Sequence, residues 1–189
     1  MEEKRSKYYF STFDLVLIAI IAGIGGVING AFMYTFIQPF KPLFAFLGPI
    51  SWVPLSGLYV LWPIIARLLI RKKGAATLCG LIQGFVEMFA GSRLGLQPIL
   101  FAGMEGFFID IGFELIKDKT KLFSSLLGAA LANLVAAEIY FFLYKMTSPF
   151  ELTVGGLIAI LSGIIFAGFL GWLIARAIYN TGIIKVGNP

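Results

Sequence analysis

Hydrophobic residues occur in six long runs along the chain, separated by short segments that hold most of the charged positions. Each run has about 20 residues, the helical length needed to cross roughly 30 Å of hydrocarbon. The strict alternation typical of membrane-spanning strands is absent. The pattern therefore predicts an all-α integral membrane protein, a bundle of six transmembrane helices forming a single domain over residues 1–189. The predicted spans are residues 14–35, 51–70, 75–91, 98–116, 122–143 and 153–177.

Basic residues are distributed unevenly among the segments between the runs. Three of the connections hold only Lys41, Arg93 and Lys145, one residue each. The remaining connections and the two ends are much more basic. Because basic segments stay on the cytoplasmic side of a membrane, we expect both termini in the cytoplasm. The basic residues on that side are Lys4, Arg5, Lys7, Arg71, Lys72, Lys73, Lys117, Lys119, Lys121, Arg176 and Lys185.

The connection at residues 36–50 differs from the other outer segments because it is long and yet apolar. It contains Pro39, Pro42 and Pro49 together with several phenylalanine and leucine residues. Irregular backbone at membrane depth has to be covered by protein. We therefore expect this segment to fold back onto the bundle as a lid on its outer side.

Composition agrees with a multi-pass protein of the cell membrane. Hydrophobic residues make up 59% of the chain and charged residues 13%, and the mean hydropathy is +0.91. The net charge of +5 suits anionic lipid headgroups better than nucleic acid. Without histidine and with one cysteine, Cys79, the chain lacks a conventional zinc ligand set and a histidine base. It also lacks the phosphate-binding loop of ATPases.

Two acidic residues lie deep inside apolar runs with no basic residue beside them. At 1.5 Å per residue, Glu87 lies about 20 Å above Gly74, and Glu105 lies about 10 Å below Pro98. Both therefore fall about 10 Å beneath the outer boundary of the hydrocarbon. The third and fourth spans are joined by a short loop and should be antiparallel neighbours. Because buried carboxylates are costly in a membrane, we expect Glu87 and Glu105 to line a substrate pocket.

Other polar and aromatic residues reach the same outer layer and complete a candidate binding site. Carboxylates accept paired N–H donors, and aromatic faces attract cations, so such a layer suits a flat, cationic or amidine-like molecule. Each residue also has a structural interpretation, as a bundle contact, an interfacial anchor or an interhelical hydrogen bond. The additional candidates are Tyr59, Trp62, Trp52, Gln97, Asn133, Glu138 and Tyr140.

Small residues four apart mark the first span, as in helices that pack closely. The pairs are Ala19 with Gly23 and Ala22 with Gly26. Spacing alone is compatible with packing inside this bundle and equally with docking of another membrane subunit. Lower in the fourth span, Asp110 lies at a depth similar to Arg67 of the second span, and we expect a structural ion pair between them.

Taken together, the chain resembles the substrate-binding S components of energy-coupling-factor (ECF) transporters, and within them the YkoE family, which is associated with thiamine or its hydroxymethylpyrimidine precursor. The resemblance covers nearly the whole length. The residues that carry it are Gly48-Pro49-Ile50, Pro54, Gly57, Ile70-Arg71-Lys72, Gly74-Ala75-Ala76, Glu87, Gly103, Glu105 and Thr181-Gly182.

The resemblance implies a division of labour between subunits. This chain would bind its vitamin from outside without a cofactor or catalysis of its own. A transmembrane T subunit, contacted through the small residues of the first helix, and two ATP-binding-cassette ATPases would drive release inside. The rival interpretations are an S component for another vitamin, an intramembrane enzyme that uses Glu87 and Glu105 as an acid–base pair, and a structural subunit without a ligand.

Overall fold

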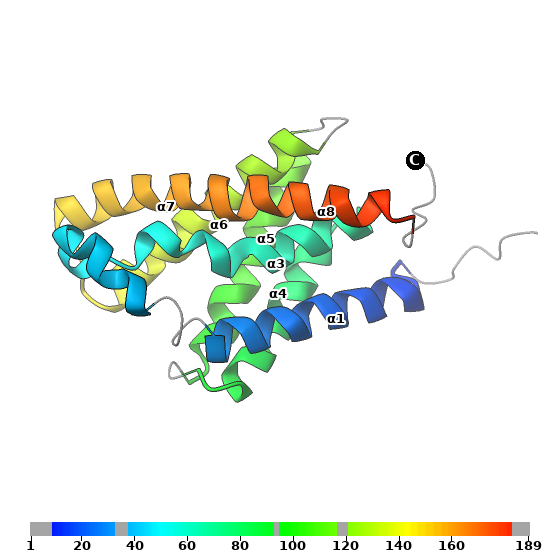
Figure 1. The fold of residues 1–189 in the computed structure, drawn as a ribbon, viewed down its shortest axis with the longest axis horizontal. Helices are drawn as coiled ribbons and strands as arrows, with labels where there is room; N and C mark the ends of the chain where they lie inside the picture. The colour runs from blue at the N-terminus through cyan, green and yellow to red at the C-terminus, as the bar shows by residue number, and fades with distance from the viewer. Residues whose placement is uncertain (1–8, 33–37, 93–94, 117–120, 183–189) are drawn as a thin grey trace, which may run out of the picture.

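The computed structural model describes residues 9–32, 38–92, 95–116 and 121–182, which form helices joined by short turns, with no strand among them. In Figure 1, α1, α3 and the rod built from α7 and α8 run along the long direction of the bundle, and α4, α5 and α6 cross it obliquely. The elements are α1 (Thr12–Val27), η1 (Ile28–Phe32), η2 (Gln38–Ile50), η3 (Val53–Leu55), α3 (Gly57–Ile70), α4 (Ala75–Phe89), α5 (Gln97–Leu115), α6 (Leu122–Leu143), η4 (Glu151–Gly155), α7 (Gly156–Ser162), η5 (Gly163–Phe169) and α8 (Leu170–Asn180).

The predicted spans coincide with these helices, or with unbroken series of them, to within three residues at each end that the structure describes. Residues 33–35 of the first predicted span lie outside the described residues. Within the described residues, four stretches are long and apolar enough to cross a membrane: Thr12–Gly30, Val53–Ile70, Leu122–Leu143 and Glu151–Asn180. The all-helical membrane fold is confirmed. Helix α4 is shorter, with 15 residues, and α5 contains three acidic residues, so six crossings remain a prediction.

The start of α1 is held by local polar contacts and by the turn that precedes α4. The Ser11 hydroxyl accepts a hydrogen bond from the Asp14 amide, and the Asp14 carboxylate accepts one from the Ser11 amide. This reciprocal arrangement satisfies backbone donors that a helix start leaves unpaired. Asp14 also forms an ion pair with Lys72 at 2.6 Å. The N-terminal end of α1 is thereby tied to the connection between α3 and α4.

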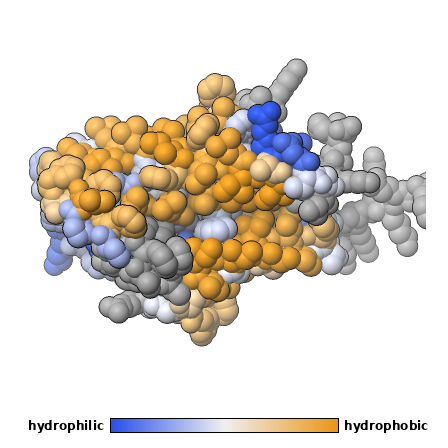
Figure 2. Space-filling view, in the orientation of Figure 1, coloured by the Kyte–Doolittle hydropathy of each residue, from blue (hydrophilic) through white to orange (hydrophobic). Residues whose placement is uncertain are grey.

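The long rod from η4 to α8 shows how this bundle is arranged for a lipid environment. Its large residues at every fourth position are exposed: Leu157, Leu161, Ile165, Phe169 and Leu173. The buried face of the same rod consists of small residues, which let helix backbones approach closely. Figure 2 shows that apolar surface covers much of the length of the bundle on the side drawn, with hydrophilic residues nearer its ends. This surface fits a multi-pass protein of the cell membrane.

The described ends of the chain meet at one end of the bundle. In Figure 1 the start of α1 and the end of α8 lie together, and η2 lies at the opposite end. A large apolar core includes Ile18 of α1, Ile64 of α3 and Cys79 of α4. A smaller core at the η2 end is built around Ile50 and Phe141. The sequence predicted that both ends of the chain lie on one side of the membrane. That this side is the cytoplasmic one remains a prediction.

Candidate functional site

Helices α4 and α5 pack with their backbones in direct contact because glycines line both surfaces. A Cβ atom added at Gly80 would lie 1.9 Å from the Ala102 carbonyl oxygen, and one added at Gly84 would lie 2.4 Å from the Pro98 carbonyl oxygen. No side chain fits into such gaps. The two helices are therefore antiparallel neighbours, as the short connection between them predicts.

Glu87 and Glu105 both belong to this α4–α5 interface. Glu87 follows Gly80 and Gly84 at helical spacing, and Glu105 follows Ala102 by three residues, so each projects from the face that contacts the other helix. Their exposed fractions are 6% and 7%. Among the residues that the structure describes, neither carboxylate has a hydrogen-bond donor or a cation as partner.

A second cluster of polar groups lies near this pair. It forms around a backbone carbonyl of α3 to which a proline donates no hydrogen bond. Pro63 has no backbone N–H, so the Tyr59 carbonyl four residues earlier lacks its helical hydrogen bond. The amide of Asn29 from η1 donates to that oxygen at 3.2 Å, and the amide of Gln83 from α4 donates at 3.4 Å. One carbonyl thus joins η1, α3 and α4 one helical turn from Glu87, since Gln83 precedes Glu87 by four residues on α4.

Asn29 and Gln83 were not anticipated from the sequence. Each is 1% exposed, and the Asn29 Oδ1 and Gln83 Oε1 atoms are buried with no hydrogen-bond donor among the described residues. Buried acceptors are nearly always satisfied in proteins, so two orphaned ones together mark a place where a donor is missing. The spacing of Gln83 and Glu87 at i and i+4 on one apolar helix is the signal that could have found the first of them.

A cluster of aromatic side chains lies near the start of α5. The Trp52 ring lies 4.6 Å from that of Tyr140, Tyr140 stacks on Tyr144 at 4.3 Å, and Phe101 lies 6.2 Å from Tyr140. The Tyr144 hydroxyl donates to the Gln97 amide oxygen at 2.9 Å. Three predicted residues, Trp52, Gln97 and Tyr140, are therefore grouped by the fold. Gln97, Phe101 and Glu105 follow one another at four-residue spacing, so one side of α5 leads from this aromatic group to the carboxylates.

Three other predicted site residues contact neighbouring helices, and their role in binding stays a prediction. The Asn133 amide donates to the Ser56 hydroxyl at 2.8 Å and to the Ala159 carbonyl at 2.6 Å, so both of its N–H donors join helices to each other. The Glu138 carboxylate lies against Gly156 of α7. The Trp62 indole packs against Gly25 of α1. These positions correspond to the structural interpretation that the sequence left open.

The segment predicted as a lid forms 3-10 turns, bent at Phe44 and at Gly48, which has a φ of 58°. Residues 36 and 37 of the predicted lid lie outside the described residues. Leu47 and Ile50 pack with Phe141 and Ala159, so the described part rests on α6 and α7. Closure over a bound ligand stays a prediction.

The small residues of α1 face two different ways. Ala22 is fully buried, and a Cβ added at Gly26 would lie 2.6 Å from Val86, so these two contact the interior of the bundle. Ala19 is exposed, and nothing lies within 4 Å of a Cβ added at Gly23. A docking role for α1 is therefore retained only for Ala19 and Gly23.

The expected pair of Arg67 and Asp110 is confirmed, at 2.9 Å between Nε and Oδ1. Thr77 donates to the other Asp110 oxygen from its amide and its hydroxyl, at 3.0 and 2.7 Å. Glu114 continues the network by pairing with Arg67 and with Lys73. These ion pairs join α3, α4 and α5 at the end of the bundle away from Glu87, and we assign them a structural role.

The fold and the apolar surface place this chain among the multi-pass membrane proteins, and its relatives place it among membrane-embedded transport subunits. The family described as "ABC-type cobalt transport system, permease component" matches residues 13–135, and the chain belongs to that family. Its fold is that of an ECF S component: it matches a solved structure, "Crystal structure of an S-component of ECF transporter", with a TM-score of 0.79 and 24% identity, covering 93% of this chain and 88% of that one.

A relative of similar length resembles this chain over most of its sequence. The "Putative HMP/thiamine permease protein YkoE" of Bacillus subtilis (strain 168) is 27% identical over 176 residues, which cover 91% of this chain and 86% of the relative. The expected resemblance to S components and to YkoE is thereby confirmed.

Proposed function

We propose that this chain is the substrate-capture subunit of an ECF transporter, and that it binds thiamine or a related pyrimidine precursor from outside the cell. A transmembrane T subunit and two ATP-binding-cassette ATPases would supply the energy for release inside. The family and the fold, both of transport subunits, support the role. The name of the Bacillus subtilis relative supports the substrate class.

The observation that carries the proposal is the unpaired polar group between α1, α3, α4 and α5. Two carboxylates and two amide oxygens, from Glu87, Glu105, Asn29 and Gln83, are buried with no donor supplied by the described protein. Every one of these groups accepts hydrogen bonds. An aminopyrimidine supplies N–H donors, and a thiazolium ring supplies positive charge, so thiamine would satisfy both the acceptors and the negative charge. Trp52 and Tyr140 would provide aromatic surfaces for its rings.

Cobalt, which the family description mentions, fits this chain less well. Cobalt sites in proteins use nitrogen and sulfur ligands as well as oxygen, and the sequence has no histidine and a single cysteine. Within the described residues there is also no group of three or more metal-ligating side chains. An organic cation with N–H donors is the better match to acceptors that lie on three separate elements, η1, α4 and α5.

The test is a tryptophan-fluorescence titration of the purified protein, which has three tryptophans. Thiamine or hydroxymethylpyrimidine should bind, and riboflavin, biotin and Co²⁺ should not. We expect Glu87→Gln or Glu105→Gln to weaken binding by about 1–3 kcal/mol, as for loss of a hydrogen bond to a charged group. Glu151→Gln is the matched control, because Glu151 begins η4 at the end of the bundle and its carboxylate only accepts a local bond from Ser148.

Three results would count against parts of the proposal. Wild-type affinity in both glutamine variants would remove the assigned role of the carboxylates. Binding of another vitamin in place of thiamine would keep the transport role and change the substrate. Conversion of an added lipid in the absence of any ATPase would favour the rival acid–base enzyme.

A further inference from the structure

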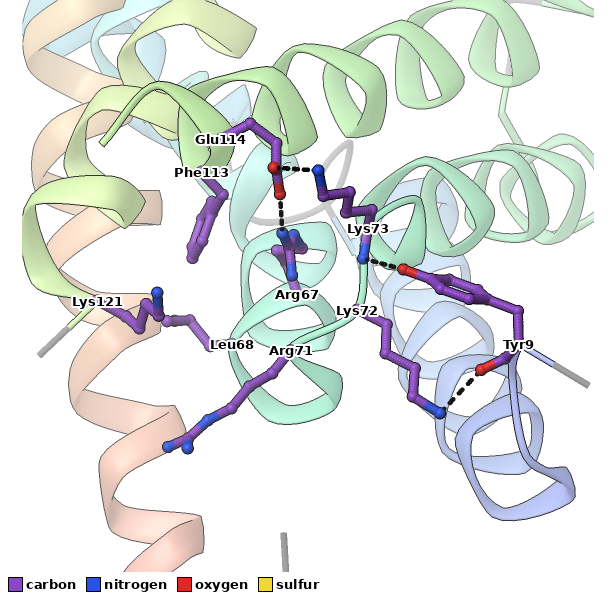
Figure 3. A pocket seen from close by; sticks show the side chains of 9 residues that line it. All are labelled: Tyr9, Arg67, Leu68, Arg71, Lys72, Lys73, Phe113, Glu114 and Lys121. Atoms are coloured by element: carbon purple, nitrogen blue, oxygen red, sulfur yellow. Dashed lines mark hydrogen bonds and ion pairs between the residues drawn. The ribbon is translucent and has the colours of Figure 1, made fainter. Parts of the chain in front are cut away.

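The charged side chains at the end of the bundle that holds the start of α1 are paired with one another. Figure 3 shows Arg67 and Lys73, from the end of α3 and the turn after it, both joined to Glu114 of α5. In the same region Lys72 pairs with Asp14 of α1. Each of these two acids thus has a basic partner on another segment of the chain.

Four buried side-chain atoms make no hydrogen bond within the described part of the chain: Arg67 Nε, Asp110 Oδ1, Asn29 Oδ1 and Gln83 Oε1. The first two satisfy each other, because they form an ion pair at 2.9 Å. The other two are both hydrogen-bond acceptors, and two acceptors cannot satisfy each other. The amide oxygens of Asn29 and Gln83 therefore need a donor from outside the described residues.

The amide nitrogens of the same two residues are anchored on a single atom. The Asn29 Nδ2 atom donates to the Tyr59 carbonyl at 3.2 Å, and the Gln83 Nε2 atom donates to it at 3.4 Å. A carbonyl oxygen has two lone pairs, so these two donors can occupy both. Turning either amide over would place its oxygen against the Tyr59 oxygen, and unpaired acceptors are costly when buried. Each amide is therefore held with its nitrogen on the carbonyl and its oxygen directed elsewhere.

Pro63 makes this arrangement possible. In a regular helix the N–H of residue 63 would donate to the carbonyl of residue 59, but proline has no N–H. Pro63 lies inside α3 and is buried. The Tyr59 carbonyl can therefore accept hydrogen bonds from the side chains of two other elements, η1 and α4. With an N–H at residue 63, a donor from the same helix would compete with the two amides for this oxygen.

Amide oxygens that are fixed as acceptors can distinguish an amino group from an oxo group. We propose that Asn29 and Gln83 make the site selective for rings that carry an exocyclic amino group, and that Pro63 is a positioning residue for both amides. This inference rests on the proposed function, which places the substrate beside these oxygens. An amino group donates to them, whereas an oxo group at the same ring position sets oxygen against oxygen. A site built to receive N–H donors rejects an analogue that lacks them.

The experiment compares two ligands, thiamine and the analogue in which an oxo group replaces the amino group of its pyrimidine. Isothermal titration calorimetry of the purified full-length protein measures both affinities. The wild-type protein should bind thiamine at least about 30-fold more tightly, as for one buried acceptor left facing an oxygen. Pro63→Ala restores the helical N–H and allows the amides to turn, so the ratio of affinities should fall to about threefold or less.

Pro98→Ala is the matched control. Pro98 is also buried, but it lies in the first turn of α5, where a backbone N–H has no partner within the helix. Its replacement restores no competing hydrogen bond, and the ratio of affinities should equal that of the wild type. A purely structural effect of either substitution would weaken both ligands alike and leave the ratio unchanged.

Equal affinity of the wild-type protein for the two ligands would overturn the inference and leave the proposed function standing, since thiamine would still bind. A wild-type ratio in Pro63→Ala would overturn the role of Pro63. Failure of thiamine and hydroxymethylpyrimidine to bind at all would overturn the proposed substrate, and this inference with it. If Pro63→Ala does not fold, Asn29→Leu and Gln83→Leu decide, because each removes one acceptor and should lower the ratio at least about fivefold. A wild-type ratio in both of these variants would overturn the inference.

Discussion

At the scale of single residues, the buried polar side chains of this protein fall into two groups. Asn133 has both of its amide donors engaged by protein acceptors, and Ser162 both accepts from Gly57 and donates to Pro54. Asn29 and Gln83 each retain an oxygen that accepts no hydrogen bond from the described part of the chain. The first group stabilises contacts between helices, and under the proposed function the second group receives the ligand.

Replacing Asn133 should therefore affect stability and leave substrate recognition intact. Asn133→Leu removes hydrogen bonds to Ser56 and Ala159 and should lower the free energy of unfolding by about 1–2 kcal/mol. The measurement is thermal unfolding in detergent, followed by ligand titration of the folded variant well below its transition. A variant that unfolds like the wild type but no longer binds ligand would show that Asn133 belongs to the site after all.

The carboxylates and the amides differ in how far the sequence could reveal them. Glu87 and Glu105 could be predicted because charge inside an apolar run is costly wherever the run packs. The pair of Arg67 and Asp110 could be predicted from equal depth in neighbouring helices. Asn29 and Gln83 depend on three helical segments meeting at the Tyr59 carbonyl, to which Pro63 donates no hydrogen bond, and this contact is visible only in three dimensions.

At the scale of helices, the α4–α5 contact positions the two carboxylates, and glycine makes it possible. Gly106 of α5 repeats the pattern of Gly80 and Gly84, since a Cβ added there would lie 2.3 Å from the Ala76 carbonyl oxygen. Three glycines on two helices allow the backbones to touch along their length. Widening this contact would separate Glu87 from Glu105.

Two glycine substitutions of the same kind should therefore have opposite effects. Gly80→Ala places a methyl group 1.9 Å from a carbonyl oxygen and should destabilise the fold by about 1–3 kcal/mol through overpacking. Gly23→Ala meets nothing within 4 Å and should be neutral or stabilising by up to about 1 kcal/mol, because alanine is the better helix former. Thermal unfolding of the two variants compares them directly, and equal midpoints would contradict the close α4–α5 contact.

The positions of the helices could be predicted from the sequence, but the face of each helix that is buried could be predicted only in part. Hydrophobic length located the helices, because a membrane span has a defined length. The sequence did not predict which small residues of α1 face the bundle and which face outward. Ala22 is buried and Ala19 is exposed because of the helices that lie beside α1, and the sequence pattern does not specify these neighbours. The turns of η2 were also not predictable, because prolines exclude a regular α-helix without specifying the alternative.

At the scale of the whole molecule, an exposed apolar strip follows α1 on the side away from the core. Leu15, Val16, Ile20 and Ile24 are each about half exposed, at 45%, 51%, 53% and 48%. The small positions Ala19 and Gly23 interrupt this strip. Large residues there fit lipid, and small residues between them leave room for a partner helix to approach.

Under the proposed function, bulk at these two positions should block assembly without affecting capture. Ala19→Leu/Gly23→Leu should bind substrate like the wild type and lose at least about tenfold in affinity for the T subunit and its ATPases, the equivalent of about 1.4 kcal/mol of steric cost. Co-purification with the T subunit and its ATPases measures this loss of affinity. Ala177→Leu, at an exposed position of α8, is the control, and equal loss in that variant would exclude α1 as the docking surface.

Helix α1 leads directly into η1, so a single rod holds the outward strip at one flank and Asn29 beside Gln83 at the other. A rotation of that rod displaces both flanks together. If substrate favours one rotation, the affinity for the neighbouring subunit shifts by a set factor, and thermodynamic reciprocity requires that subunit to shift the affinity for substrate by the same factor. Substrate binding and association with the neighbouring subunit would then be thermodynamically linked through the rod formed by α1 and η1.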